Sequence, residues 1–301
     1  MNIYENISSN KRNSIILVLL FFIILISLGY FIGFYYGNFY TGIGIGFFAM
    51  VFSIIMTLIN FYAGDKIILK MSSAKPADKK THGRLIYAVE GIAIAAGIPT
   101  PKIYIIEDSA INAFATGRDL EHASVTVTTG AIERLNKLEL ESVVAHEISH
   151  IKNYDIRLMM FVVILVGMIT LLSDWFLRSM FYGKRKNGAK IDGVIGLVFV
   201  ALGIALIVLS PIIARLIKLA VSRKREFLAD ANGALLTRYP KGLADALKKI
   251  RDDKEPLVEA ANKATAHLFI ENPLRKFKGR MNIMFSTHPD INDRIKRLEY
   301  M

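Results

Sequence analysis

The chain has 301 residues, enough for one large domain or two smaller ones, and 53% of them are hydrophobic, with a mean hydropathy of +0.38. This apolar share exceeds that of ordinary soluble proteins, so a membrane protein is the first class to consider. The absence of cysteine excludes disulfides and thiolate metal sites. The net charge of +12 comes without any nucleic-acid-binding motif, so it indicates the cytoplasmic flanks of membrane segments and no nucleic-acid partner.

Two uncharged apolar runs near the N-terminus, residues 15–36 and 42–63, are each long enough to cross a bilayer as a helix. The first is longer than a signal-peptide core and is not followed by a small-residue cleavage site, so we expect a retained anchor. Basic residues precede the first run and follow the second, whereas the connector is uncharged. The positive-inside rule therefore predicts a transmembrane hairpin, residues 1–64, whose two ends face the cytoplasm.

Residues 65–157 have the pattern of a water-exposed domain. A helix is predicted over 81–99, where helical periodicity ends in a glycine and a proline. Strands are predicted over 102–107 and 123–129. The second strand alternates valines with small polar residues, which predicts one buried and one exposed face.

A further helix, predicted to begin at Asn136 with Glu139 in a capping-box position, carries a His-Glu-x-x-His motif. His146 and His150 are four residues apart and share one helix face, so both imidazoles can bind one Zn²⁺. Glu147 begins the same turn and can take a proton from a water molecule that the metal activates. The alternative is a solvated helix face with two chance histidines, which the three fixed residues disfavour. The motif predicts a zinc centre.

Two more apolar runs, residues 158–177 and about 194–217, predict a second hairpin over 158–217 that spans the membrane or is inserted into it. The loop 178–192 contains mostly basic charges, which conflicts with a location outside the cell under the positive-inside rule. Full crossing and shallow insertion therefore both stay open. Residues 218–301 are polar and mostly helical by pattern.

The remaining metal ligand should be a carboxylate, because the glycine and third histidine that a metzincin places after His150 are absent. Asp155 lies about 140° round the helix from His150, at ~100° per residue, and would need a bend in the chain to reach the metal. Glu226 lies in a predicted helix, with Asp230 one turn later, where it can accept a hydrogen bond from a ligand histidine. The alternative is an exposed pairing of both acids with neighbouring arginines.

A shared metal also constrains the topology. The motif helix and Glu226 must lie on the same side of the membrane, so the segment between them crosses it zero or two times. Both metal-binding segments are therefore expected on the side of the N-terminus, which is the cytoplasm.

Five segments, in order along nearly the whole chain, resemble the HtpX family of membrane-bound zinc metalloproteases. They are INAFATG (111–117), SVTVTTG (124–130), ELESVVAHEISHIKNYD (139–155), SRKREFLADANGALLT (222–237) and THPDINDRIKRL (287–298). One departure is Tyr154, which stands where the family usually has arginine, before Asp155.

The resemblance implies an integral membrane gluzincin of the α+β class, mainly α with a small β-sheet. Its protease domain would be formed by residues 65–157 and 218–301, with the second hydrophobic hairpin inserted between them. By motif, the zinc ligands are His146, His150 and Glu226, and Glu147 is catalytic.

The resemblance also implies a zinc metalloendopeptidase of the bacterial inner membrane, multi-pass, with its active site facing the cytoplasm. Its partners would be the lipid bilayer and misfolded or damaged membrane proteins, and self-cleavage is a further expected reaction. A transporter is disfavoured because the apolar runs hold almost no ionisable residues. A catalytically inactive zinc-binding scaffold or adaptor is the alternative function, and the presence of Glu147 disfavours it.

Two segments are candidates for substrate binding. Strand 123–129 is a candidate edge strand to which a peptide could add by β-augmentation, and an ordinary sheet strand is an equal alternative. The family pattern places residues 112–113 in contact with substrate near the metal, with a structural loop as the alternative. The candidate residues are Asn112, Ala113, Ser124, Val125 and Thr126.

The remaining histidines have weaker assignments. His288 is a candidate oxyanion stabiliser, because zinc proteases need a donor beside the metal, and an exposed histidine before proline is the alternative. The spacing of His82, His122 and His267 does not fit a metal site, so these three are expected at the surface.

Overall fold

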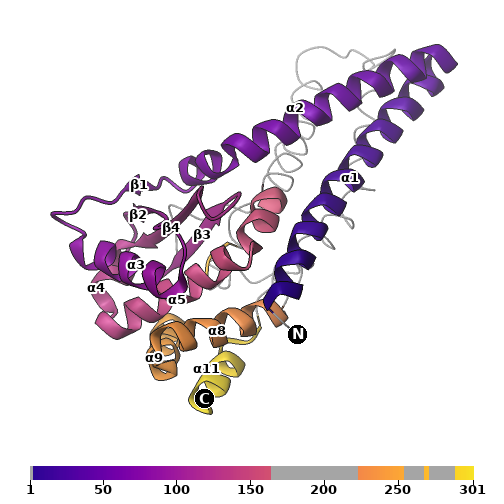
Figure 1. The fold of residues 1–301 in the computed structure, drawn as a ribbon. Coiled ribbons are helices and arrows are strands. Elements are labelled where there is room, and N and C mark those ends of the chain that lie inside the picture. Colours follow the sequence, from indigo (N-terminus) through magenta and orange to yellow (C-terminus); the bar gives the residue numbers. More distant parts are fainter. Residues whose placement is uncertain (1–2, 164–222, 254–267, 271–288) are drawn as a thin grey trace, which may run out of the picture.

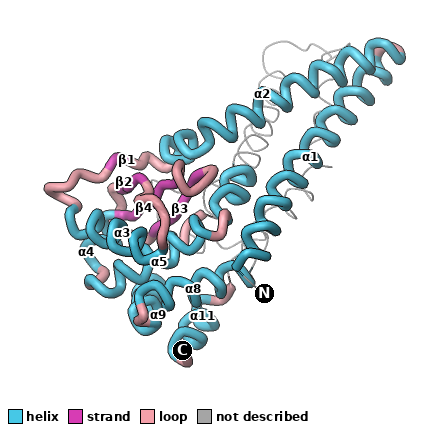
Figure 2. Tube along the Cα trace, viewed as in Figure 1, coloured by secondary structure: helices cyan, strands magenta, loops and turns pink. Residues whose placement is uncertain are grey.

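The computed structural model describes residues 3–163, 223–253, 268–270 and 289–301 (Figures 1 and 2). This part of the chain is mainly helical with one small mixed sheet, so the predicted α+β class is confirmed. The predicted second hairpin lies outside the described residues except for its first few, which are helical up to residue 163.

Two long apolar helices, α1 (Ile3–Tyr36) and α2 (Phe39–Met71), form a hairpin that projects from the rest of the protein (Figure 1). Asn38 caps the start of α2. Gly33 allows close contact near the turn, because a Cβ there would lie 2.6 Å from the carbonyl oxygen of Thr41. Both helices are long and apolar enough to cross a membrane, and only 14% and 17% of their most apolar stretches is buried. That exposure distinguishes them from the core helices of a soluble protein.

The sheet has the strand order β1-β2-β4-β3. β4 pairs in parallel with β2 and antiparallel with β3, while β1 pairs antiparallel with β2. The strands are β1 (Lys75–Pro76), β2 (Lys102–Ile106), β3 (Ala113–Gly117) and β4 (Ala123–Thr128). The two predicted strands are confirmed as β2 and β4, and β3 is an additional strand at one end of the sheet that the described residues form.

For residues 123–129 the expected exposed face and the candidate edge position are wrong, and the alternative of an ordinary sheet strand is confirmed. β4 is hydrogen-bonded to a neighbour on both sides, and all six of its residues are buried. Thr126 shares a face with its partner Phe114, which belongs to an apolar layer on the second face of the sheet. Because this layer covers the polar side chains, the alternation of polar and apolar residues does not mark a solvent-exposed face.

Within the described residues, six further labelled helices pack with the sheet or with one another, and α8, α9 and α11 lie beyond α5 as seen from the sheet (Figures 1 and 2). The predicted helix over 81–99 is confirmed, and it ends where Gly97 takes a left-handed φ of 67°. The predicted capping box of Asn136 and Glu139 is present at the start of the motif helix. The helices are α3 (Gly83–Ala96), α4 (Thr129–Arg134), α5 (Lys137–Lys152), α8 (Arg223–Thr237), α9 (Pro240–Asp252) and α11 (Ile291–Glu299).

Two apolar clusters enclose the sheet and position α5. The first fills the space between the sheet and helices α3, α5, α9 and α11, with Val125 and Ile148 fully buried. The second joins the end of α2 to the other face of the sheet through Ile68, Phe114 and Phe269. Helix α5 thus lies in the interior, packed against strands on one side and against α8 on another.

Candidate metal centre

Helix α5 carries its motif residues into the interior of the protein. His146 is 1% exposed and Glu147 3% exposed, so neither lies on a solvated helix face. Helix α8 packs closely on α5 because Gly233 has no side chain: a Cβ there would lie 3.1 Å from the backbone nitrogen of His146. This close approach brings the first turn of α8, which contains Glu226, to the motif.

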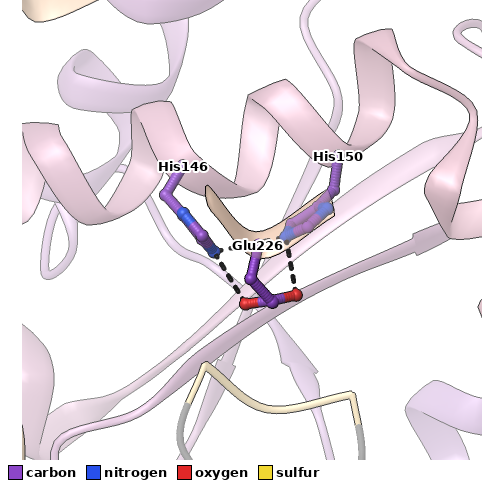
Figure 3. Close-up of side chains that lie close together, drawn as sticks. All are labelled: His146, His150 and Glu226. Carbon is purple, nitrogen blue, oxygen red and sulfur yellow. Dashed lines mark hydrogen bonds and ion pairs between the residues drawn. The ribbon is translucent and has the colours of Figure 1, made fainter. Parts of the chain in front are cut away.

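Three predicted ligands converge between α5 and α8 (Figure 3). The Nε2 atoms of His146 and His150 are 3.2 Å apart. The carboxylate of Glu226 lies 3.8 Å from His146 Nε2 and 3.6 Å from His150 Nε2. The two distances to Glu226 involve its two different oxygens, and one donor atom from each of the three residues lies within 4.8 Å of the other two. Donors bound at about 2.0–2.2 Å to one tetrahedral metal ion lie roughly 3.2–3.6 Å from one another, so the three residues are grouped near the spacing that one such ion needs. Glu226 is 3% exposed, so the alternative of an exposed surface acid is wrong.

Each imidazole has a carboxylate beside its other ring nitrogen. Asp230 Oδ1 lies 2.9 Å from His146 Nδ1, and Asp155 Oδ2 lies 3.0 Å from His150 Nδ1. A proton on Nδ1 that is donated to the carboxylate leaves Nε2 with its lone pair, the tautomer that a metal ligand requires. The two rings are therefore oriented for metal binding by residues that do not touch the ligand atoms.

Asp155 reaches His150 through a sharp bend after α5. Asn153 ends the helix, and Tyr154 takes a left-handed backbone conformation with φ of 59°. The bend that a contact from Asp155 would need is therefore present. The carboxylate meets Nδ1 of His150, on the opposite side of the ring from the ligand atom, so Asp155 supports the histidine and does not replace Glu226 as the third donor.

Arg294 of α11 is a residue of the site that the sequence interpretation did not identify. It is 1% exposed and donates from Nη2 and Nε to the two oxygens of Asp230 at 2.7 Å and 2.9 Å. Its Nη1 lies 3.6 Å from Glu226. A signal was present in the sequence: Arg294 shares the apolar face of its helix with Ile291 and Leu298, where a charged residue requires a buried partner.

Burial and charge shift the acid–base properties of the motif. Burial raises the pKa of Glu147, and the nearby positive groups only partly oppose this shift. Burial alone would lower the pKa of His150, but the hydrogen bond with Asp155 and the surrounding carboxylates outweigh it and raise the pKa to about 9. The metal-free site therefore holds a proton on His150 at neutral pH, which a bound metal would displace.

A small cavity opens beside the ligands. Glu147 lines it together with Ala115 of edge strand β3, Met159 and Phe269. The backbone of Ile270 donates a hydrogen bond to the carbonyl oxygen of Ala113 at 3.0 Å, so residues 268–270 lie along the start of β3. The cavity thus extends from Glu147 to strand β3 at Ala115.

The other predicted site residues lie elsewhere or outside the described part. Asn112 and Ala113 are buried at the start of β3, where Asn112 Oδ1 accepts from the backbone N–H of Ala113. Ser124, Val125 and Thr126 lie in the interior strand β4, away from any strand edge. His288 and His267 lie outside the described residues. His122 is exposed as predicted, and His82 is partly buried.

Comparison with known proteins gives consistent matches. The model of the family "Peptidase family M48" matches residues 79–301. A protein named "Protease HtpX homolog" from Dictyoglomus thermophilum is 46% identical over 99% of this chain and 94% of its own length. Proteins of the same name from Caldanaerobacter subterraneus subsp. tengcongensis and Streptococcus thermophilus are 43% and 38% identical, again over 99% of this chain.

Among solved structures, Ste24p from S. mikatae matches with a TM-score of 0.49 and 20% sequence identity. The match covers 84% of this chain and 57% of that chain, so this chain spans little more than half the length of Ste24p.

Proposed function

The chain belongs to peptidase family M48 and is a metallopeptidase, and from this premise we propose a membrane-bound endopeptidase that uses Zn²⁺ held by His146, His150 and Glu226. The observation that carries the proposal is the convergence of two imidazole nitrogens and one carboxylate on a single point, with each Nδ1 already facing a carboxylate. Such an arrangement would hold a metal ion through three protein ligands and leave a fourth position for a water molecule.

The donor set favours Zn²⁺ over other common metals. Mg²⁺ and Ca²⁺ prefer shells made of oxygen, whereas imidazole with one carboxylate suits zinc. Three protein ligands with one open position are typical of catalytic zinc sites. When bound, Zn²⁺ would lower the pKa of a water ligand to about 7 and polarise the carbonyl group of the scissile peptide bond.

Glu147 is the proposed general base. It is buried in the ligand cavity, and its raised pKa moves it toward the range in which a base works near neutral pH. The carboxylate accepts a proton as water oxygen adds to the carbonyl carbon. It then donates that proton to the amine nitrogen as the carbon–nitrogen bond breaks, so the base is regenerated after each cleavage.

The proposed substrate site is the edge of β3 in place of β4. Ala115 lines the cavity beside Glu147, and β3 is the terminal strand of the described sheet on this side. An extended peptide that adds to this edge would present its backbone to the cavity, with main-chain hydrogen bonds supplying affinity that does not depend on sequence. The start of the strand at Ala113 already accepts a hydrogen bond from Ile270, so the peptide would add beyond it, beside Ala115, and Asn112 and Ala113 would lie at the end of the bound segment.

The membrane location follows from the two exposed apolar helices and from the relatives named as HtpX homologs. We extend this to an inner-membrane, multi-pass protein with the zinc site facing the cytoplasm, since basic residues flank the hairpin on its proposed cytoplasmic side. Misfolded or damaged membrane proteins are the proposed substrates, in a role of protein quality control, and self-cleavage is expected at high enzyme concentration.

The proposal is tested with two substitutions and one control in the purified full-length protein. Glu147→Gln should abolish cleavage of an unfolded test protein, and self-cleavage, while zinc stays bound. Glu226→Ala should lower zinc content after dialysis, because one of three donors is lost. The control Glu141→Gln changes a partly exposed acid on the same helix and should alter neither activity nor zinc content.

The outcomes separate the steps. Undiminished proteolysis by Glu147→Gln contradicts the mechanism, and full zinc occupancy in Glu226→Ala contradicts the ligand set. A wild-type protein that binds zinc but cleaves none of a panel of unfolded and membrane substrates would support the zinc-binding scaffold instead.

A further inference from the structure

The first turns of the N-terminal membrane helix reach the metal centre. Asn10 of α1 is 3% exposed, although Lys11 and Arg12 beside it are exposed. Ser14, one turn later on the same face, is also buried, and its hydroxyl donates to the carbonyl oxygen of Asn10. This face of α1, just before the apolar stretch, is therefore docked against the protein and does not face lipid.

The side-chain amide of Asn10 contacts both sides of the bend that follows α5. Its Nδ2 lies 2.6 Å from Asp155 Oδ1 and 2.9 Å from the carbonyl oxygen of Asn153. An amide nitrogen carries two hydrogens, so both contacts can form together. They hold the two residues on either side of Tyr154, whose left-handed conformation creates the bend.

Asp155 passes this contact on to a metal ligand. One of its oxygens faces Asn10, and the other lies 3.0 Å from Nδ1 of His150. Arg225 of α8 lies farther away, with its Nε 3.7 Å from Asp155 Oδ1. The contact with Asn10, at 2.6 Å, is shorter than the contacts of Asp155 with His150 and Arg225, and it comes from a segment distant in sequence.

We infer that Asn10 is a positioning residue for the metal centre: by holding Asp155 against His150, it makes the docked N-terminal membrane helix a structural part of the metal site. The chemistry is that of an outer-sphere partner, which orients a ligand without touching the metal. Loss of such partners typically weakens metal binding 10–100-fold when they contact the ligand directly. Asn10 acts one residue further out, so about a threefold to tenfold loss of zinc affinity is expected.

The inference rests on the proposed metal site, so its test measures zinc affinity and not proteolysis alone. The proteins are wild type, Asn10→Ala, Asp155→Ala and the double variant, each full length in detergent or lipid nanodiscs. Competition with a chromophoric zinc chelator gives the affinity of each. Asn13→Ala, the same change three residues along the same helix, is the matched control, and thermal unfolding of the metal-free proteins checks that all are folded.

If Asn10 acts through Asp155, Asn10→Ala weakens zinc binding in the wild-type background and has no further effect once Asp155 is alanine. The KM for a test peptide at saturating zinc should stay unchanged, since Asn10 does not line the cavity. An equal loss in both backgrounds would show a general role in docking α1 and overturn the inference. So would unchanged affinity in Asn10→Ala.

Failure of the inference and failure of the proposed function give different results. If Asn10→Ala binds zinc like wild type while Glu226→Ala releases it, the metal site stands and only the role of Asn10 is lost. If Glu226→Ala also keeps its zinc, the proposed ligand set itself is wrong.

Discussion

Arg294→Met tests how the buried charges of the metal centre are balanced. The guanidinium is 1% exposed, forms two short contacts with Asp230 at 2.7 Å and 2.9 Å, and lies 3.6 Å from Glu226. Removing one member of a buried ion pair costs about 3–5 kcal/mol, because the other charge is left without compensation. Methionine keeps much of the volume, so the loss should reflect charge and hydrogen bonds more than a cavity.

The metal-free variant should therefore unfold at a midpoint roughly 6–20 °C below wild type, at about 2–4 °C per kcal/mol. Bound Zn²⁺ supplies positive charge beside the same carboxylates, so the shift should be smaller in the zinc-loaded protein. Thermal unfolding by circular dichroism in detergent, with zinc or with a chelator, measures both shifts. Lys296→Met is the control, since Lys296 is exposed on the same helix. A metal-free shift below about 2 °C, or equal shifts with and without zinc, would refute the reasoning.

Two further predictions concern the same centre. Because the pKa of His150 is raised to about 9 in the metal-free protein, zinc binding near pH 7 should release about one proton, and zinc affinity should rise with pH until about 9. Titration calorimetry in two buffers of different ionisation enthalpy measures the released proton. A binding enthalpy that does not depend on the buffer would contradict this prediction. Gly233→Ala should push α8 away from α5, because the new Cβ would lie 3.1 Å from the backbone nitrogen of His146. Both zinc affinity and thermal stability should therefore fall. A variant with wild-type zinc affinity would contradict this prediction and show that the contact between the two helices can relax.

The metal-binding motif could be predicted from the sequence because its geometry is local. An α-helix places His146 and His150 on one face whatever surrounds them, and the capping box at Asn136 marks where that helix begins. Glu226 was assigned because the motif still needed a carboxylate ligand and because its segment resembles the HtpX family, and helical spacing then placed Asp230 one turn later. Local rules sufficed for the motif on α5, whereas the ligand on α8 also needed the resemblance.

The residues that support the site from a distance followed no local rule. The contact of Asp155 with His150 depends on the left-handed backbone conformation of Tyr154. A tyrosine rarely adopts this conformation, and position 154 does not hold the glycine or asparagine that would indicate it. Asn10 lies in a polar stretch just before the first apolar run, and no local pattern marks it as part of the site. Its partners, Asp155 and the backbone of Asn153, are more than 140 residues away in sequence.

The predicted exposed face and edge position of β4 were wrong for a related reason. Ser124 and Thr126 alternate with valines, and alternation usually marks a face in water. In the structure the second face of the sheet is covered by an apolar layer that includes Phe114 and residues from the end of α2. Whether a strand lies at the edge depends on the order of strands in the sheet. Here β3, which was not predicted, pairs with the outer side of β4, and the pattern of residues within β4 does not indicate this neighbour.

The carboxylates that support the two imidazoles are themselves held by contacts of different strength. This difference predicts different effects when each support is removed. Asp230, behind His146, is held by a fully buried arginine that forms two charge-assisted hydrogen bonds. Asp155, behind His150, is held by the neutral amide of Asn10 and by a guanidinium at 3.7 Å. Substitution of Arg294 leaves the buried charge of Asp230 uncompensated and should mainly lower stability. Substitution of Asn10 removes a neutral donor to Asp155 and should mainly lower metal affinity. The contact from α1 is therefore the support whose change should alter metal binding while the protein stays folded.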